Sequence, residues 1–291
     1  MNRAKMFRNQ WNQGMTGECG KIVVGYGFFS IYLLYILWIV CLEVSDSICF
    51  ALGLPQRTTI SRITVLILLG FGVYKVRGRV RVLRFKWDLK YAAGLAVIVL
   101  IGCLRSVYPD TAYDTFNYHL AAQTPGFVNY FTEHFGKGNF QIWGFRLGDR
   151  CFTLFRHLLG YRFGTLLNVW VLTVSYLQLG GLLEGYFKRA RNGLLYRIFC
   201  NEQLWALMIL LNAQNLMQIG GYYVDLLAVP IGLEMLRKLL DTLQKKQGGL
   251  EIYYMALLSG VWLGFKLTNI VYIIPYVVAY LVLIRKQYIC K

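Results

Sequence analysis

The sequence predicts an all-helical membrane protein with about eight transmembrane helices. Of its 291 residues, 57% are hydrophobic and only 15% are charged, whereas about a quarter of the residues in a soluble domain are charged. Apolar runs recur along the whole chain, without a separate soluble domain between them. We therefore expect one transmembrane domain over residues 1–291, with a long outer loop at 108–162 that contains amphipathic interfacial helices.

Eight apolar runs are candidates for the spans. A span needs roughly 20 apolar residues, with about 17 as a practical minimum. The first run follows basic N-terminal residues but is too long for a signal peptide, so we expect it to be retained. The last run is too long for one crossing, and we divide it where Lys266 interrupts it. The candidate spans are 22–42, 58–74, 91–107, 163–185, 203–221, 222–237, 250–266 and 267–284.

Basic residues predict on which side each loop lies. Lysine and arginine accumulate in cytoplasmic loops, and most of the 31 here fall in alternate gaps, beginning with the N-terminal segment. Both termini are therefore expected in the cytoplasm. The same alternation places the loop 108–162, the junction of the fifth and sixth spans and the turn at Lys266 on the outer side, together with Glu43 and Asp46.

The net charge of +17 does not indicate a nucleic-acid partner. Such a partner would require basic residues gathered on one soluble face, whereas here they separate apolar runs. The seven cysteines form no C-x-x-C pair and have no metal-ligand spacing, so we interpret them as packing residues.

The segment after the third span concentrates polar side chains. Residues 107–122 carry Asp110, Asp114, His119 and three tyrosines, in a chain with only 14 acidic residues. Asp110 follows a proline and also fits the start of a turn, whereas Asp114 also fits the cap of a short helix that starts at Thr115. His119 is equally consistent with a phosphate ligand and with an interfacial histidine bonded to the backbone. The spacing of these residues does not indicate a metal site. The sequence does not show whether the protein uses a cofactor such as a divalent metal.

Two further charged residues lie near the outer ends of later spans. Asp225 lies just inside the sixth span, where an ionisable residue costs about 3 kcal/mol or more and is a functional candidate by default; helix capping is the plain alternative. Lys266 either binds an anionic group or reaches to the lipid headgroups. The fifth span carries amides on adjoining helical faces, which we expect to face protein or water: Asn212, Gln214, Asn215 and Gln218.

The second half of the long loop predicts a helix that lies along the outer membrane surface or packs on the bundle. Asp149, Thr153 and Arg156 fall on one face of it. Aromatic residues at 127–143 precede the helix and either anchor the loop at the interface or stack on a sugar. The opposite, apolar face carries Leu147, Cys151, Leu154, Phe155 and Leu158.

Three stretches resemble, in order, signatures of the bacterial GT-C class of membrane glycosyltransferases. The stretch Y-D-T-F-N-Y-H-L at 113–120 is similar to the first outer loop of that class, with its aspartate followed by Tyr-His-Leu. The stretch Y-Y-V-D-L-L-A at 222–228 is similar to a later span with an aspartate near its outer end, and G-V-W-L-G-F-K-L-T at 260–268 to a span that ends in Gly-x-Lys-x-Thr. The resemblance covers roughly residues 90–284.

The resemblance implies an enzyme of the bacterial plasma membrane. Such an enzyme takes a sugar from a lipid-linked donor, a polyprenyl phosphate, and transfers it beside the membrane lipids to a glycan, lipid or protein acceptor on the outer side. The reaction needs a base for the acceptor hydroxyl and positive charge for the leaving phosphate. The resemblance implies Asp114 as the base, and Asp110, four residues earlier, is a candidate second carboxylate or metal ligand. The expected substrate-binding residues are His119, Tyr118, Asp225, Lys266 and Arg146.

Two other interpretations stay open. Asp225 and Lys266 fit an intramembrane ion pair in a transporter or flippase of an anionic lipid or solute, although the repeated halves common in transporters are not visible in this sequence. Members of the resembled class commonly have several more spans, so the end of this chain at Lys291 also fits an inactive, truncated relative.

Overall fold

The computed structural model describes residues 19–52, 70, 89–120, 147–187, 201–244 and 250–289. Within these residues every regular element is a helix, which confirms the predicted all-helical class. The elements are α2 (Cys19–Ala51), α4 (Leu89–Val107), the π-helical η1 (Thr115–His119), α7 (Leu147–Phe163), α8 (Leu166–Phe187), α10 (Glu202–Leu210), α11 (Ala213–Gln218), α12 (Asp225–Gln244), α13 (Leu250–Phe265), the 3-10 turn η3 (Leu267–Asn269) and α14 (Ile270–Ile289).

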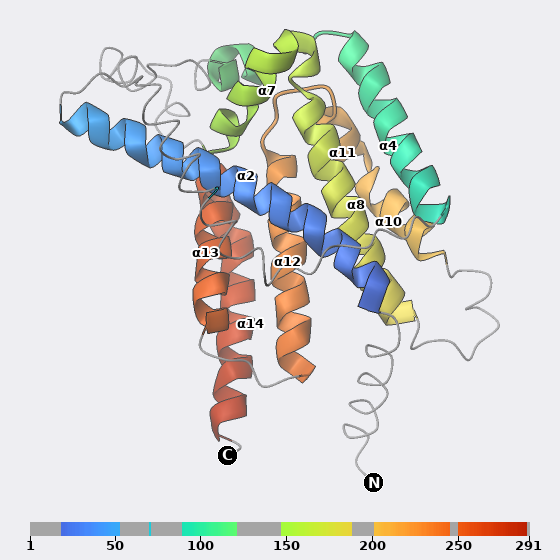
Figure 1. The fold of residues 1–291 in the computed structure, drawn as a ribbon, viewed down its shortest axis with the longest axis vertical. Helices are drawn as coiled ribbons and strands as arrows, with labels where there is room; N and C mark the ends of the chain where they lie inside the picture. The colour runs from blue at the N-terminus through green and yellow to red at the C-terminus, as the bar shows by residue number, and fades with distance from the viewer. Residues whose placement is uncertain are drawn as a thin grey trace.

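The helix α8 lies in the middle of the bundle (Figure 1). It is apolar on nearly every side, as expected for a helix surrounded by protein, and it packs against α2, α4, α10 and α12. The helix α2 crosses the bundle obliquely, and its buried Tyr32 donates a hydrogen bond to the backbone oxygen of Leu227 on α12 at 2.5 Å. The core therefore lies where α2, α8 and α12 meet.

Among the residues that the structure describes, three segments are long and apolar enough to cross a membrane. They are Gly27–Ser45 in α2, Leu166–Gly185 in α8 and Leu267–Arg285 in η3 and α14. The helical stretches Tyr91–Val107 and Glu251–Phe265 are apolar but shorter. These segments agree with a membrane protein, whereas the number of eight spans stays a prediction. The predicted span 58–74 lies, except for residue 70, outside the described residues.

The helix α2 is longer than the predicted span 22–42. It continues to Ala51, so Glu43 and Asp46 lie in a helix and not in a loop. The charge of Glu43 is compensated there, because the guanidinium of Arg150 on α7 lies 3.2 Å from its carboxylate. The prediction of a loop around Glu43 and Asp46 was therefore wrong, because an acid that pairs with an arginine on another helix leaves no signal in the nearby sequence.

The prediction of one continuous span at 203–221 is wrong. The helix α10 ends at Leu210, and α11 is a separate helix of six residues. Asn212 caps α11 by accepting a hydrogen bond from the backbone N–H of Asn215 at 3.0 Å, and the Asn215 amide donates to the backbone oxygen of Leu210 at 2.8 Å. The amides thus break the helix, because they bond backbone groups that the helix would otherwise use.

The hairpin predicted at Lys266 is present. The helix α13 ends at Phe265, Lys266 is extended, and η3 leads into α14. The side-chain amide of Asn269 closes the turn by donating to the backbone oxygen of Trp262 at 3.0 Å. In Figure 1 the two helices lie side by side, and both contact α12.

The helix α7 begins at Leu147, where the predicted amphipathic pattern begins, and packs against α2, α4, α8 and α13. Leu147 and Cys151 are buried, as predicted. Leu158 is 72% exposed, which agrees with an apolar face that is turned toward lipid at this point of the helix. One predicted position is wrong: Asp149, expected on the polar face, is only 4% exposed. The helical pattern only separates polar from apolar residues, so it predicts an exposed Asp149. It cannot reveal that His119, on another segment, pairs with this acid in the interior. The aromatic residues at 127–143 lie outside the described residues.

Candidate functional site

A short turn between two helices is the framework of the candidate site. We call residues 219–224, which connect α11 to α12, the α11–α12 turn. Gly220 has a φ of 87°, a conformation that favours glycine, and a Cβ there would lie 2.9 Å from the Cβ of Arg105. Arg105 donates from Nε to the backbone oxygen of Ile219 at 3.1 Å. A charged side chain from α4 therefore fixes the first half of the turn.

Buried amides fix the same turn from α8 and from α11. The side chain of Asn168 on α8 donates to the backbone oxygens of Gln218 and Gly221, both at 3.0 Å. The side-chain oxygen of Gln218 accepts from the backbone N–H of Leu226 at 3.0 Å, and so serves the first turn of α12. Because buried backbone groups need such partners, these amides fix where α12 begins.

Asp110 ties the segment after α4 to this turn. Its Oδ1 accepts from the backbone N–H of Ala112 at 2.9 Å, which makes the turn expected after a proline. Its Oδ2 accepts from the Thr115 hydroxyl at 2.5 Å and from the backbone N–H of Tyr222 at 3.0 Å. The carboxylate is thus committed to three donors, and its use as a second catalytic carboxylate stays a prediction.

Tyrosine hydroxyls connect α7 to the same region. The hydroxyl of Tyr161 donates to the backbone oxygen of Asp110, and that of Tyr222 donates to the backbone oxygen of Tyr161, both at 2.5 Å. Tyr222 is fully buried, and its ring packs edge-on against Phe152 with 5.3 Å between centroids. The α11–α12 turn is therefore held from α4, α7 and α8 together.

Asp114 lies at the start of η1 but does not cap it. Its backbone is helical, with a φ of −63° and a ψ of −36°, whereas a capping residue is extended, and its side chain makes no capping bond. The capping interpretation is therefore wrong. The side chain is half-buried, and within the described residues no hydrogen bond or ion pair engages its carboxylate. Burial and the nearby carboxylates of Asp110 and Asp114 raise the pKa of Tyr223, so this phenol keeps its proton at neutral pH.

His119 forms a buried pair with an acid that the sequence did not indicate. Its Nδ1 lies 2.5 Å from Oδ1 of Asp149 on α7, and both residues are 4% exposed. The ring meets that of Tyr223 edge-on, with 6.1 Å between centroids. His119 therefore has a carboxylate partner, which neither interpretation of the sequence named. The pair joins η1 to α7. No sequence motif around Asp149 indicates that this residue pairs with His119.

Asp225 and Lys266 pair with each other. The ammonium of Lys266 lies 2.8 Å from the carboxylate of Asp225, the first residue of α12. Their side chains are 48% and 39% exposed. The pair connects the start of α12 to the turn between α13 and α14, and Asp225 follows Tyr223 by two residues. Two acids of the predicted set thus lie next to the same turn: Asp110 accepts from its Tyr222 N–H, and Asp225 directly follows it.

The remaining predicted site residues are not placed. Arg146 and the side chain of Tyr118 lie outside the described residues. Among the side chains that the structure describes, no three His, Cys, Asp or Glu residues approach closely enough to hold a metal ion. We use the name α7-end cluster for the residues that do come together around the α11–α12 turn: Asp110, Asp114, His119, Asp149, Tyr223, Asp225 and Lys266.

Comparison of this chain with protein-family models, with curated proteins and with solved structures finds no match. The function of the α7-end cluster therefore has to be inferred from its own chemistry. That chemistry comprises a half-buried carboxylate, a buried acid–histidine pair, a protonated phenol and a partly exposed ammonium group.

Proposed function

We propose that the protein is a membrane glycosyltransferase of the GT-C kind. It moves a sugar from a polyprenyl-phosphate carrier to an acceptor hydroxyl on the outer side, where the acceptor is a glycan, a lipid or a protein. The observation that carries the proposal is Asp114: a half-buried carboxylate without a described partner, beside the α11–α12 turn. A carboxylate that no structural bond uses is available to accept a proton.

In this reaction the acceptor oxygen bonds to the anomeric carbon of the sugar. The bond from that carbon to the phosphate oxygen breaks at the same time, and polyprenyl phosphate leaves. Asp114 takes the proton of the acceptor hydroxyl, and the ammonium of Lys266 stabilises the charge on the leaving phosphate. The protons and electron pairs balance without any further reactant.

Asp110 has a different part in this proposal. Its carboxylate already accepts from Ala112, Thr115 and Tyr222, so it holds η1 against the α11–α12 turn. The buried pair of His119 and Asp149 holds the other end of η1 to α7. Together these bonds position Asp114, which heads the same short helix.

Lys266 is suited to exchange partners. An ion pair between partly exposed side chains contributes only about 0–1 kcal/mol, so a phosphate competes with Asp225 at small cost. The pair keeps the ammonium beside the start of α12 until the donor arrives. This role agrees with the substrate-binding position that the sequence resemblance implies for both residues.

The proposal is tested with membranes that contain the full chain and polyprenyl phosphates carrying labelled sugars. We expect label to move from the carrier to a second product, and Asp114→Asn to reduce this transfer at least about 100-fold. Tyr113→Phe is the matched control, because Tyr113 is the neighbouring residue, is 78% exposed and should leave transfer unchanged. Equal transfer by Asp114→Asn at equal expression would remove Asp114 from the mechanism.

One observation favours a second function. Asp225 and Lys266 form the pair expected in a transporter or flippase of an anionic lipid or solute, and the pair links two parts of the bundle. Such a pair opens when an anion binds the ammonium. Uptake of an unchanged labelled anion into vesicles, lost in Lys266→Gln, would support transport, whereas a covalent product would support transfer.

A further inference from the structure

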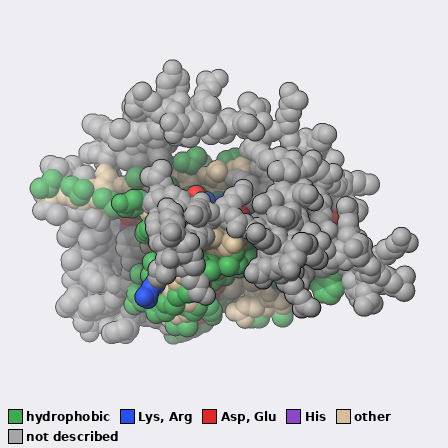
Figure 2. Space-filling model, turned by 90° about the horizontal axis from the view of Figure 1, so that it is seen from below, with side chains coloured by type: hydrophobic (Ala, Val, Ile, Leu, Met, Phe, Trp, Pro, Cys, Tyr) green, Lys and Arg blue, Asp and Glu red, His purple; other side chains and the backbone are tan. Residues whose placement is uncertain are grey.

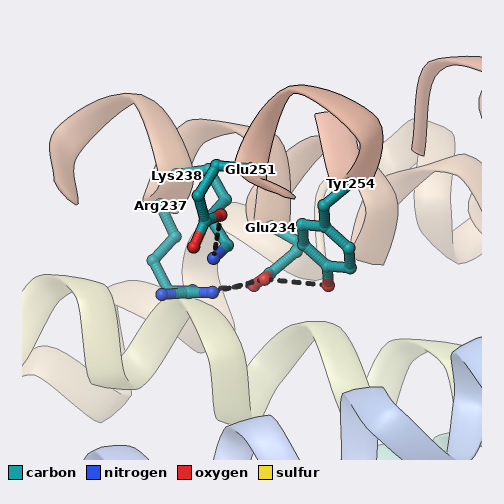
Figure 3. A pocket seen from close by; sticks show the side chains of 5 residues that line it. All are labelled: Glu234, Arg237, Lys238, Glu251 and Tyr254. Carbon is teal, nitrogen blue, oxygen red and sulfur yellow. Dashed lines mark hydrogen bonds and ion pairs between the residues drawn. The ribbon is translucent and has the colours of Figure 1, made fainter. Parts of the chain in front are cut away.

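A charged pocket lies at the end of the bundle opposite to the α7-end cluster. It is lined by Glu234, Arg237 and Lys238 of α12 and by Glu251 and Tyr254 of α13 (Figure 3). Its volume is about 290 Å³. Lys238 lies about 20 Å along α12 from Asp225, at about 1.5 Å per residue. The pocket is therefore separate from the proposed transfer site, and no inference about it rests on the proposed function.

The inner part of the pocket is a saturated network. Glu234 is 2% exposed and accepts two bonds from the guanidinium of Arg237, one of them from Nε at 2.8 Å. Figure 3 shows the Tyr254 hydroxyl, which donates to Glu234 at 3.1 Å. Arg237 also pairs with Asp241 at 2.5 Å. These groups already bond to each other, so they form the inner wall of the pocket and hold their positions.

The outer part of the pocket has unused bonding capacity of both signs. The ammonium of Lys238 donates to Oε2 of Glu251 at 2.7 Å and lies 4.9 Å above the centre of the Tyr254 ring. An ammonium has three donors, and within the described residues only this one hydrogen bond is made. Oε1 of Glu251 likewise has no described partner, and the Glu251 side chain is 32% exposed.

We infer that this pocket binds a small zwitterion that carries an ammonium group with N–H donors and an anionic phosphate or carboxylate. The anionic group binds the spare donors of Lys238, and the ammonium binds the free oxygen of Glu251. The pocket is lined by two carboxylates and two cations. The carboxylates would repel a ligand that is only an anion, and the cations would repel a ligand that is only a cation. A ligand with both charges satisfies both sides.

The size and place of the pocket fit such a ligand. Binding pockets are usually about 300–1,000 Å³, so this one takes a headgroup-sized molecule. The pocket lies where α12 nears its end and α13 begins, and α12 packs on α8 and α14, which both carry spans. Figure 2 shows this end of the molecule, where the visible described side chains are mostly hydrophobic. The zwitterion is thus either an amine-bearing lipid headgroup or a soluble molecule of the same chemistry.

The experiment uses the purified full chain in detergent. It is incubated with vesicles of equal parts phosphatidylethanolamine and phosphatidylcholine, and native mass spectrometry measures the lipid retained. Binding of free O-phosphoethanolamine is measured in parallel by calorimetry. The choline headgroup is the matched probe, because its quaternary ammonium has no N–H to donate to Glu251.

We expect about tenfold preference for the ethanolamine lipid, or binding of free O-phosphoethanolamine, which identifies a soluble source. Lys238→Gln and Glu251→Gln should each abolish the preference, whereas Arg285→Gln, which removes an exposed cation of α14, should retain it. Equal retention of both lipids by the unsubstituted chain, together with no binding of O-phosphoethanolamine, would overturn the inference whether or not the variants fold. Because the readout is binding, it is independent of sugar transfer.

Discussion

At the scale of single residues, two acids of the same short segment have opposite uses. Asp110 is saturated with three donors and connects two parts of the chain that are far apart in sequence. Asp114 heads η1, and its side chain makes no hydrogen bond or ion pair among the described residues. The hydrogen-bond partners thus distinguish a structural carboxylate, Asp110, from a reactive one, Asp114. The free energy of unfolding of variants at the two positions tests this distinction.

Replacement of Asp110 should destabilise the protein much more than replacement of Asp114. Asp110→Ala leaves the backbone N–H of Tyr222 and the hydroxyl of Thr115 without an acceptor, so we expect a loss of roughly 2–4 kcal/mol. Asp114→Ala should change the free energy of unfolding by less than about 0.5 kcal/mol. Denaturant titration of both variants in one detergent measures the difference. Equal losses would contradict the assigned structural role of Asp110.

The buried pair of His119 and Asp149 should behave as one unit. Asp149→Leu alone removes the carboxylate that His119 contacts, and His119→Leu alone removes the ring that Asp149 contacts. Each change should therefore lower the free energy of unfolding by about 1–3 kcal/mol. The double variant should cost less than the sum by at least about 1 kcal/mol.

A second cycle serves as the control for this coupling. Asp149→Leu and Glu251→Gln lie at opposite ends of the bundle, so their effects should add within about 0.5 kcal/mol. Additivity of the His119 and Asp149 variants themselves would show that the contact contributes nothing to stability.

At the scale of elements, the chain between α10 and α12 decides where the candidate site lies. The length of the apolar runs correctly predicted helices near 22–42, 91–107, 163–185 and both sides of Lys266, because such runs are a local feature of the sequence. The same criterion failed at 203–221, an apolar run in which Asn212 and Asn215 bond nearby backbone groups and end α10. The tight turn that follows depends on Gly220 and on Asn168 from another helix, which no local pattern reveals.

Two glycines with opposite surroundings test the importance of this turn. Gly220→Ala places a Cβ on a backbone with a φ of 87°, 2.9 Å from the Cβ of Arg105. We therefore expect the free energy of unfolding to fall by about 1–3 kcal/mol. Gly260 lies within α13 with nothing within 4 Å of a new Cβ, so Gly260→Ala should be neutral or stabilise by up to about 1 kcal/mol. Thermal unfolding of both variants measures the contrast, and similar melting temperatures would contradict it.

At the scale of the whole molecule, charged groups gather at the two ends of the bundle. The sequence predicted that Asp110, Asp114, Asp225 and Lys266 lie at one end, and the bonds around the α11–α12 turn and at the start of α12 bring these segments together. Asp149 and Glu234 were not predicted as site residues, because a buried acid is recognised by its partner and not by its neighbours in sequence. The three candidate spans within the described part of the chain agree with a membrane protein, and its sidedness stays a prediction.

Sidedness is tested with single cysteines in a chain that lacks the seven native ones. Thr268 is exposed at the turn between α13 and α14, and Leu243 is 62% exposed near the end of α12. An impermeant maleimide should label Thr268→Cys in intact cells, because that turn is predicted to face outward. Leu243→Cys should react only after the membrane is opened. The reverse pattern would place the α7-end cluster in the cytoplasm.

Sealed proteoliposomes with the purified chain and a labelled polyprenyl-phosphate sugar test the central claim most directly. One sample reports both covalent product and movement of unchanged label. We predict a glycosylated product that requires Asp114, with transfer lost in Asp114→Asn and retained in Tyr113→Phe. Movement of unchanged label without any product, abolished by Lys266→Gln and indifferent to Asp114→Asn, would contradict sugar transfer and establish transport in its place.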